Sequence, residues 1–366
     1  MSKLKTYLKK YFIDSMGAMA QGLFASLLIG TIFGTIGKYL GPDYVNSSFV
    51  NFIGGCFIEL QKYCAGAAGM AIGVAIAYSM KCSPLVVFSS AGVGYLSYSL
   101  GAAITAADGS VINYTAGPAG AFFVVIIACE IGMLVSKKTK VDILVTPSVT
   151  LISGYIAARI ICPAVAYVMY WLGEFIARAT GYAPLLMGIV IAVVVGMVLT
   201  LPISSAAICA IIFSSAAIEA SAYSEALLLA GGAAAVGCCC QMVGFAVASF
   251  KENGWGGIVS QGIGTSMLQM GNIVRHPQIW IPATLSGAIC GALSTTVFML
   301  QCSGVSAGMG TCGLVGILGI LSTSGTSAKV LVGILLLCIV LPGVLSLVFA
   351  EIMRKIGWIK EDYMKL

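Results

Sequence analysis

The sequence is poor in charge. Only 9% of its 366 residues are Asp, Glu, Lys or Arg, against about 25% in an average soluble domain. Hydrophobic residues make up 59%, so too little polar side chain is present to cover a water-soluble globule of this size. A soluble enzyme, a nucleic-acid-binding protein and a disordered chain are therefore excluded. The remaining class is an all-α polytopic protein of the lipid bilayer.

Groups that carry chemistry are also scarce. The single histidine, His276, allows no Ser-His-Asp set, and no P-loop occurs. Thirteen cysteines include no CxxC pair, and Cys238, Cys239 and Cys240 are consecutive, which does not fit the spacing of tetrahedral metal ligands. We therefore expect no metal and no cofactor, and we interpret the cysteines as small apolar packing residues.

Long apolar runs, by contrast, are frequent. A helix needs about 20 mostly apolar residues to cross a bilayer, so a chain of this length has room for about ten crossings. We expect spans at 17–40, 58–80, 84–107, 117–136, 143–175 (interrupted at Pro163), 184–201, 203–222, 226–250, 279–301 and 328–352. Residues 1–16 are basic and amphipathic, which predicts a cytoplasmic N-terminus lying along the membrane surface.

The positions of Lys and Arg predict the orientation. If both termini are cytoplasmic, fourteen of the nineteen cations fall in the termini and loops of one side. Cytoplasmic loops carry an excess of Lys and Arg. The pattern therefore favours ten spans with the N- and C-termini in the cytoplasm.

Two stretches are too polar and too rich in glycine to be plain spans. Residues 251–278 read KENGWGGIVSQGIGTSMLQMGNIVRHPQ, and residues 302–327 read CSGVSAGMGTCGLVGILGILSTSGTS. Irregular backbone at membrane depth survives only where protein or a watery cavity satisfies its polar groups. We interpret both stretches as re-entrant hairpins that enter from opposite faces and meet at a substrate site. The alternative is that they are large surface loops.

Few ionisable residues lie within the expected spans, and burying one costs several kcal/mol, so each is a functional candidate. Glu130 is expected either to pair with the Lys-rich loop at 137–140 or to act in function. Arg159, in the middle of a span, needs an anionic partner or substrate. Glu174 and Arg178 lie near the expected outer surface and should be solvated.

Uncharged amides point to a different chemistry. Gln241, Gln261, Gln269 and Asn272 are clustered in or near the first hairpin. In a dry site, amides hydrogen-bond hydroxyl groups well, which is what sugar recognition requires. His276 is either a polar cap at a helix start or a ligand-binding group.

The sequence resembles the integral membrane subunit, enzyme IIC, of the bacterial phosphoenolpyruvate-dependent sugar phosphotransferase system (PTS). The resemblance is to the branch that contains the PfoR-like proteins, and it extends over nearly the whole chain. The strings that carry it are YFIDSMGAMAQGLFASLLIGTI (11–32), VSKKTKVDILVTP (135–147), LPISSAA (201–207), QMVGFAVASFKENGWGG (241–257), QGIGTSMLQMGNIVRHPQIWIPATL (261–285) and SAGMGTCGLVG (306–316).

This resemblance implies one integral membrane transporter domain over 1–366, a homodimer in the bacterial cytoplasmic membrane, and a sugar or sugar-like solute. It also implies a cytoplasmic IIB partner in trans, since no fused IIA or IIB domain and no phosphotransfer residue is expected in this chain. The positions implied to bind solute are Gln241, Glu252, Asn253, Thr265, Gln269, Asn272, His276 and Thr311. The family pattern has Pro at Gly271, Asn at His276 and Ser at Cys312, so His276 is not expected to be obligatory.

Two other functions stay open. A membrane sensor or regulator of gene expression could keep the permease fold without transport. An ion-coupled secondary transporter would use Glu130, Asp142 or Arg159 as coupling groups, although these charges also suit structural roles.

Overall fold

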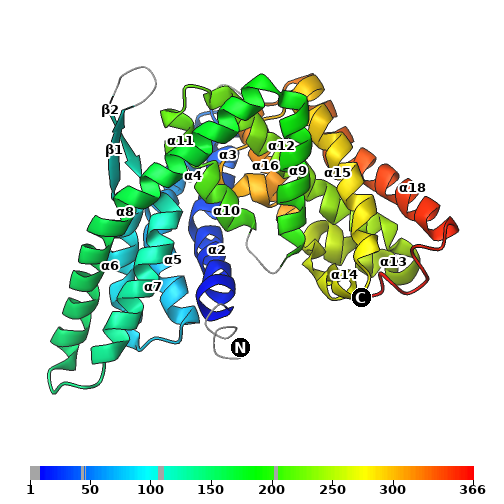
Figure 1. Cartoon of the computed structure of the whole chain (residues 1–366). Coiled ribbons are helices and arrows are strands. Elements are labelled where there is room, and N and C mark those ends of the chain that lie inside the picture. The colour runs from blue at the N-terminus through cyan, green and yellow to red at the C-terminus, as the bar shows by residue number, and fades with distance from the viewer. Residues whose placement is uncertain (1–8, 43–44, 46, 106–110, 202–204) are drawn as a thin grey trace. The chain divides into compact units, whose positions relative to one another are not determined.

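A computed structural model describes residues 9–42, 45, 47–105, 111–201 and 205–366 (Figure 1). Within these residues the chain is mostly helical and has one antiparallel pair of strands. Six helical runs are long and apolar enough to cross a bilayer, or seven if one pair of helices bent by 50° counts as a span. The chain is therefore an all-α polytopic membrane protein, as its composition predicts. Residues 1–8, half of the amphipathic segment 1–16, lie outside the described residues.

The chain divides into two compact units, Met1–Leu172 and Gly173–Leu366, and the single transporter domain stays a prediction. The elements of the first unit are η1 (Lys9–Asp14), α2 (Ser15–Leu23), η2 (Phe24–Leu28), α3 (Ile29–Tyr39), α4 (Ser48–Gly66), α5 (Ala68–Ser79), α6 (Pro84–Ser99), β1 (Gly101–Thr105), β2 (Val111–Thr115), α7 (Gly117–Val135) and the first part of α8 (Asp142–Tyr182).

Small residues bring the helices of the first unit close together. On α5, a Cβ added at Gly73 would overlap the backbone carbonyl of Ser90 on α6. The Ser90 hydroxyl donates to the carbonyl of Gly73 at 3.0 Å, so the contact is also hydrogen-bonded. Close backbone approach through small residues is how helices associate in a bilayer, where the lipid is as apolar as the side chains.

Several expected spans differ from the structure. The span at 58–80 falls on two helices, α4 and α5, that are bent by 50°, and the span at 203–222 contains two short helices, Ser205–Ile212 and Ser215–Ala220. The run at 84–107 ends as a helix at Ser99, because the chain then becomes β1, in which Gly101 pairs with Thr115 of β2. The expected interruption at Pro163 is wrong. Helix α8 runs without a break through Pro147 and Pro163. A proline removes one backbone hydrogen bond, and spanning helices tolerate this where neighbouring groups compensate.

The second unit is built around α12 (Ser224–Ala248), whose apolar 18-residue stretch is 83% buried. Helices α9 (Pro184–Thr200), α15 (Ile281–Leu293) and α18 (Leu341–Lys355) pack against it. The other elements are α10 (Ser205–Ile212), α11 (Ser215–Ala220), α13 (Phe250–Val259), η3 (Ser260–Gly264), η4 (Ser266–Gln269), α14 (Met270–Arg275), η5 (Pro277–Trp280), η6 (Ser294–Phe298), η7 (Gly304–Gly308), η8 (Cys312–Leu314), α16 (Val315–Ser324), α17 (Ala328–Ile334) and η9 (Leu335–Val340).

The segment 300–311 is irregular and largely buried. Gly310 has φ +55°, and a Cβ there would lie 2.7 Å from the backbone of Cys238 and Cys239. These cysteines are in the middle of α12, so this irregular backbone lies at the depth of the middle of a buried span. The Ser205 hydroxyl donates to the carbonyl of Gly308 at 2.7 Å, which satisfies part of this backbone. A re-entrant hairpin requires this arrangement.

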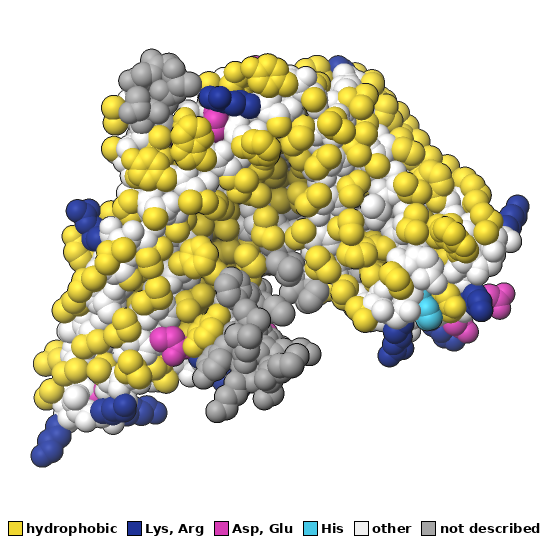
Figure 2. All heavy atoms as spheres, viewed as in Figure 1, with side chains coloured by type: hydrophobic (Ala, Val, Ile, Leu, Met, Phe, Trp, Pro, Cys, Tyr) yellow, Lys and Arg dark blue, Asp and Glu magenta, His cyan; other side chains and the backbone are white. Residues whose placement is uncertain are grey.

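The surface agrees with a bilayer environment. Figure 2 shows hydrophobic side chains over most of the visible face, whereas Lys, Arg, Asp and Glu gather at a few places on its edges. Soluble monomers rarely expose apolar patches of more than a few hundred Å². The orientation of the two termini stays a prediction.

Candidate functional site

The two predicted hairpins meet beside α12. The hydroxyl of Thr311, in the second hairpin, donates to the carbonyl of Gly262, in the first, at 2.6 Å. The same hydroxyl lies 3.6 Å from Sδ of Met242 on α12. Thr311 is 4% exposed. Hydrogen bonding to a backbone carbonyl in an apolar setting therefore makes Thr311 the link between the two hairpins, and we call this contact the hairpin junction.

The first hairpin is a chain of short helical turns rather than one helix. Gly254 breaks α13 with φ 57° and ψ −153°, a conformation that glycine adopts without steric cost. Thr265 is extended and its hydroxyl accepts a hydrogen bond from the N–H of Met267, which caps η4. The predicted site residue Thr265 thus shapes the hairpin backbone.

Gln261 organises the interior of this hairpin. Its side-chain N–H groups donate to the Ser249 hydroxyl at 2.9 Å and to the Gly257 carbonyl at 3.3 Å. Its oxygen accepts a hydrogen bond from the amide of Gln269 at 2.9 Å. Both glutamines are fully buried. The Asn272 amide in turn donates to the Gln269 oxygen at 2.9 Å, so Gln261, Gln269 and Asn272 form a chain of amide hydrogen bonds.

Replacing Gln261 with Ala should lower the free energy of unfolding by about 1–3 kcal/mol, because it leaves buried donors and acceptors of its neighbours unpaired. Gln278→Ala is the matched control: this half-buried amide makes one described hydrogen bond, to the carbonyl of Trp358. Denaturant unfolding in detergent would measure both. A loss for Gln278→Ala as large as that for Gln261→Ala would contradict the assigned role.

The remaining amides of the hairpin hold the last residues of the chain. The Gln269 side chain donates to the carbonyl of Met364 at 2.8 Å, and that of Asn272 donates to the carbonyl of Lys365 at 2.8 Å. Asn253 donates to the same Met364 carbonyl at 2.7 Å and accepts from the N–H of Leu366 at 2.9 Å. Three predicted solute-binding residues are thus occupied by main-chain groups of residues 364–366.

Two further predicted residues also contact the C-terminal part of the chain. The His276 ring stacks on Tyr363, with ring centroids 3.7 Å apart and planes inclined by 4°. Glu252 accepts from Arg354 at 2.9 and 3.1 Å, and both side chains are mostly buried, with 7% and 13% exposed. Arg354 was not expected as part of the site, since its place in a C-terminal helix suggested only a cytoplasmic cation.

Gln241 has different partners from the amides of the first hairpin. Its oxygen accepts from the indole N–H of Trp280 at 3.1 Å, and its N–H donates to the Thr284 hydroxyl at 3.1 Å. The side chain is 1% exposed. Gln241 therefore joins α12 to the start of α15 and does not share a contact with the amides of the first hairpin.

The candidate coupling charges of the first unit have local partners. Glu130 accepts from Lys10 at 2.6 Å and from Tyr11 at 2.9 Å, so the expected pairing with the loop at 137–140 is wrong. Asp142 accepts from the N–H of Lys137 and the Thr146 hydroxyl at the start of α8. Arg159 is exposed and has no ion pair among the described residues. Their role in coupling stays a prediction.

Glu174 corrects another expectation. Its side chain is 2% exposed rather than solvated. It accepts from Arg178 at 2.9 Å and from the Ser221 hydroxyl at 2.8 Å. The sequence separation of Glu174 and Ser221 hides this contact, which only the packing of α8 near α11 brings about.

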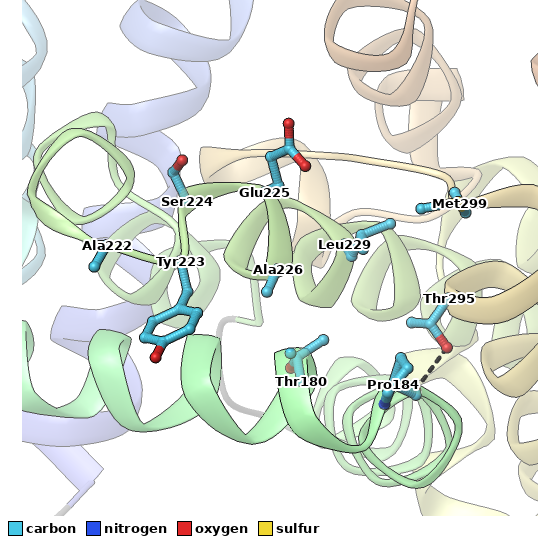
Figure 3. A pocket seen from close by; sticks show the side chains of 11 residues that line it. Thr180, Pro184, Ala222, Tyr223, Ser224, Glu225, Ala226, Leu229, Thr295 and Met299 are labelled. Atoms are coloured by element: carbon cyan, nitrogen blue, oxygen red, sulfur yellow. Dashed lines mark hydrogen bonds between the residues drawn. The ribbon is translucent and has the colours of Figure 1, made fainter.

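A cavity of about 550 Å³ lies between the end of α8 and the start of α12 (Figure 3). The hydroxyls of Thr180 and Thr295 both donate to backbone carbonyls, at 2.7 Å each. Glu225 points away from Thr180 (Figure 3). The lining of the cavity also includes the polar side chains of Tyr223, Ser224 and Glu225.

The cysteines are mostly interior residues: nine of the thirteen are buried. Within the part of the chain that the structure describes, no three His, Cys, Asp or Glu side chains form a cluster that could hold a metal ion.

Comparison with known proteins identifies the family. The model of the phosphotransferase system EIIC family matches residues 13–366, which is nearly the whole chain and includes both hairpins. A search of curated proteins finds no match. The resemblance to the PfoR-like branch stays a prediction. The chain belongs to the phosphotransferase system EIIC family, the membrane-embedded permease components of PTS sugar transport.

Proposed function

We propose that this protein moves a sugar-like solute across the bacterial cytoplasmic membrane by alternating access around the hairpin junction. The observation that carries the proposal is the buried Thr311–Gly262 hydrogen bond. It joins two irregular segments next to a spanning helix, which is where transporters of this general design place their substrate.

The chemistry near the junction suits hydroxyl groups. The surrounding side chains include amides, hydroxyls and the apolar cluster of Leu199, Cys238 and Met242, with Cys312 packed against it. Ser266 adds a buried hydroxyl for which the described residues provide no hydrogen-bond partner. A dry site with uncharged donors and acceptors binds neutral polyols without the desolvation cost of a buried charge.

Phosphorylation requires a partner in this proposal. A cytoplasmic IIB protein acting in trans would phosphorylate the solute as it leaves. We also infer a homodimer. Its support is α8, whose apolar 18-residue stretch is only 28% buried, the lowest value among the candidate spans. Such a face needs lipid or a second copy to cover it.

The ion-coupled alternative loses support from the local contacts of Glu130 and Asp142. Each carboxylate already accepts two hydrogen bonds within the described chain. No specific observation favours a sensor or regulator that lacks transport.

A thermal-stability screen of the purified protein tests the proposal. The panel would contain hexoses, disaccharides, pentitols, ascorbate and sugar acids. A ligand at 100 times its Kd stabilises the protein by about 2.7 kcal/mol, which a melting curve detects. We expect one solute class to raise the Tm, and no shift with any class would contradict a solute site of this chemistry.

Thr311→Val should abolish that shift, because it removes the hydroxyl at the junction while keeping the shape of the side chain. Thr296→Val is the matched control, since its exposed hydroxyl donates only to the carbonyl of Ala292. These variants are cleaner than changes at Gln269 or Asn272, which also contact residues 364 and 365. An unaltered solute shift in Thr311→Val would place the site elsewhere.

A further inference from the structure

The last eight residues of the chain pack as an anchored strap. After α18 the chain turns back, and Ile359 and Met364 become 2% and 0% exposed. Both join a core cluster that includes Phe245, Ile273 and Ala350. The strap therefore connects the end of α12, the first hairpin and α18 through buried side chains.

Between its anchors the strap is open to solvent. Its exposed residues are Lys360, Glu361, Asp362, Lys365 and Leu366. The ion pair between Lys365 and Asp362 has both partners 62% and 70% exposed, and such pairs contribute little to stability. The strap contains turns but no helix or strand. Without regular secondary structure, the strap depends on its two buried side chains, on the amides of the first hairpin and on the stacking of Tyr363 on His276. A segment held by side-chain anchors at a surface can open locally while the rest of a protein stays folded.

The strap offers the hairpin the same hydrogen-bonding groups as a hydroxylated solute. The carbonyls of Met364 and Lys365 accept from Gln269, Asn253 and Asn272, and the N–H of Leu366 donates to Asn253. Hydrogen-bond acceptors with a donor beside them are also what the hydroxyls of a sugar provide. The Tyr363 ring covers one face of His276.

We propose that residues 359–366 form an intramolecular latch that occupies the amides of the first hairpin and excludes solute from them. This inference rests on the proposed function. Release of the latch frees Asn253, Gln269 and Asn272 for solute and uncouples the hairpin from α18. The latched state is therefore the resting, low-affinity state of the permease.

The test compares two full-length variants with the wild type. Met364→Ser weakens the buried anchor and should open the latch. Lys365→Ala is the matched control, because the Lys365 side chain is exposed and its backbone carbonyl remains. Hydrogen exchange of residues 359–366 should be at least tenfold faster in Met364→Ser and unchanged in Lys365→Ala. If Met364→Ser does not fold, Tyr363→Ala takes its place in these tests. It removes the stacking on His276 and keeps the buried Met364 side chain.

Two binding measurements then test the latch and the solute site separately. A labelled peptide with the sequence of residues 359–366 should bind Met364→Ser at least tenfold more tightly than the wild type, and adding Asn272→Ala should remove this gain. The solute identified by the thermal screen should also bind Met364→Ser about tenfold more tightly, and the peptide should compete with it.

An open latch with no gain in peptide binding would overturn the proposal, and so would peptide binding that leaves solute affinity unchanged. If no panel solute binds either the wild type or Met364→Ser, the proposed function fails together with the solute-excluding role. The peptide measurement would still decide whether the strap is a displaceable occupant of the hairpin.

Discussion

Gly310→Ala is expected to lower the free energy of unfolding by about 2–5 kcal/mol and to abolish solute binding. Gly310 has φ +55°, where a Cβ costs about 1–2 kcal/mol. The new Cβ would also lie 2.7 Å from the backbone of Cys238 and Cys239 on the most buried candidate span. Neither backbone can yield easily, and overpacking of this kind adds about 1–3 kcal/mol.

Gly304→Ala separates the cost of a Cβ at positive φ from the cost of overpacking. Gly304 has a similar φ of +58°, but no atom lies within 4 Å of its added Cβ. This variant should therefore lose only the conformational part, about 1–2 kcal/mol, and keep solute binding. Denaturant unfolding in detergent and the thermal screen measure both properties. Equal losses for the two variants would show that the second hairpin does not pack tightly on α12.

The second large effect is expected at Arg354. Arg354→Met should destabilise the protein by about 3–5 kcal/mol, because it leaves the mostly buried carboxylate of Glu252 without its charge partner. Arg354 also donates to the carbonyl of Ala248 at the end of α12 and to Glu351. Its loss should therefore loosen the end of α12, the first hairpin and α18 together.

Lys251→Ala is the control for a surface pair. Lys251 contacts Glu351 at 2.7 Å with its side chain 65% exposed, so its removal should change stability by about 0–1 kcal/mol. The double variant Glu252→Gln/Arg354→Met should recover much of the loss, since no buried charge is left unpaired. Thermal unfolding of the four proteins gives the comparison. A double variant as unstable as Arg354→Met would show that packing, not charge, accounts for the effect.

The amide cluster shows how far residue types alone predict a site. Gln261 and Gln269 do bond to each other inside the first hairpin, as their type and spacing favour. Gln241 does not join them, although it is an amide of the same kind, because its position on α12 faces Trp280 and Thr284. The direction of a side chain around a packed helix depends on neighbours that are distant in sequence.

Composition and apolar runs by themselves determined the membrane class and the helical fold, because crossing a bilayer demands long apolar segments with internally paired backbone. Glycine-rich polar stretches likewise predicted that 251–278 and 302–327 are not plain spans, and the structure has short helical turns and irregular backbone there. The tertiary structure alone decided that Thr311 bonds to Gly262, that Glu130 pairs with Lys10, and that the last residues occupy the amides of the first hairpin. These contacts join groups 49 to 120 residues apart, and no local pattern specifies which distant partner satisfies a buried polar group.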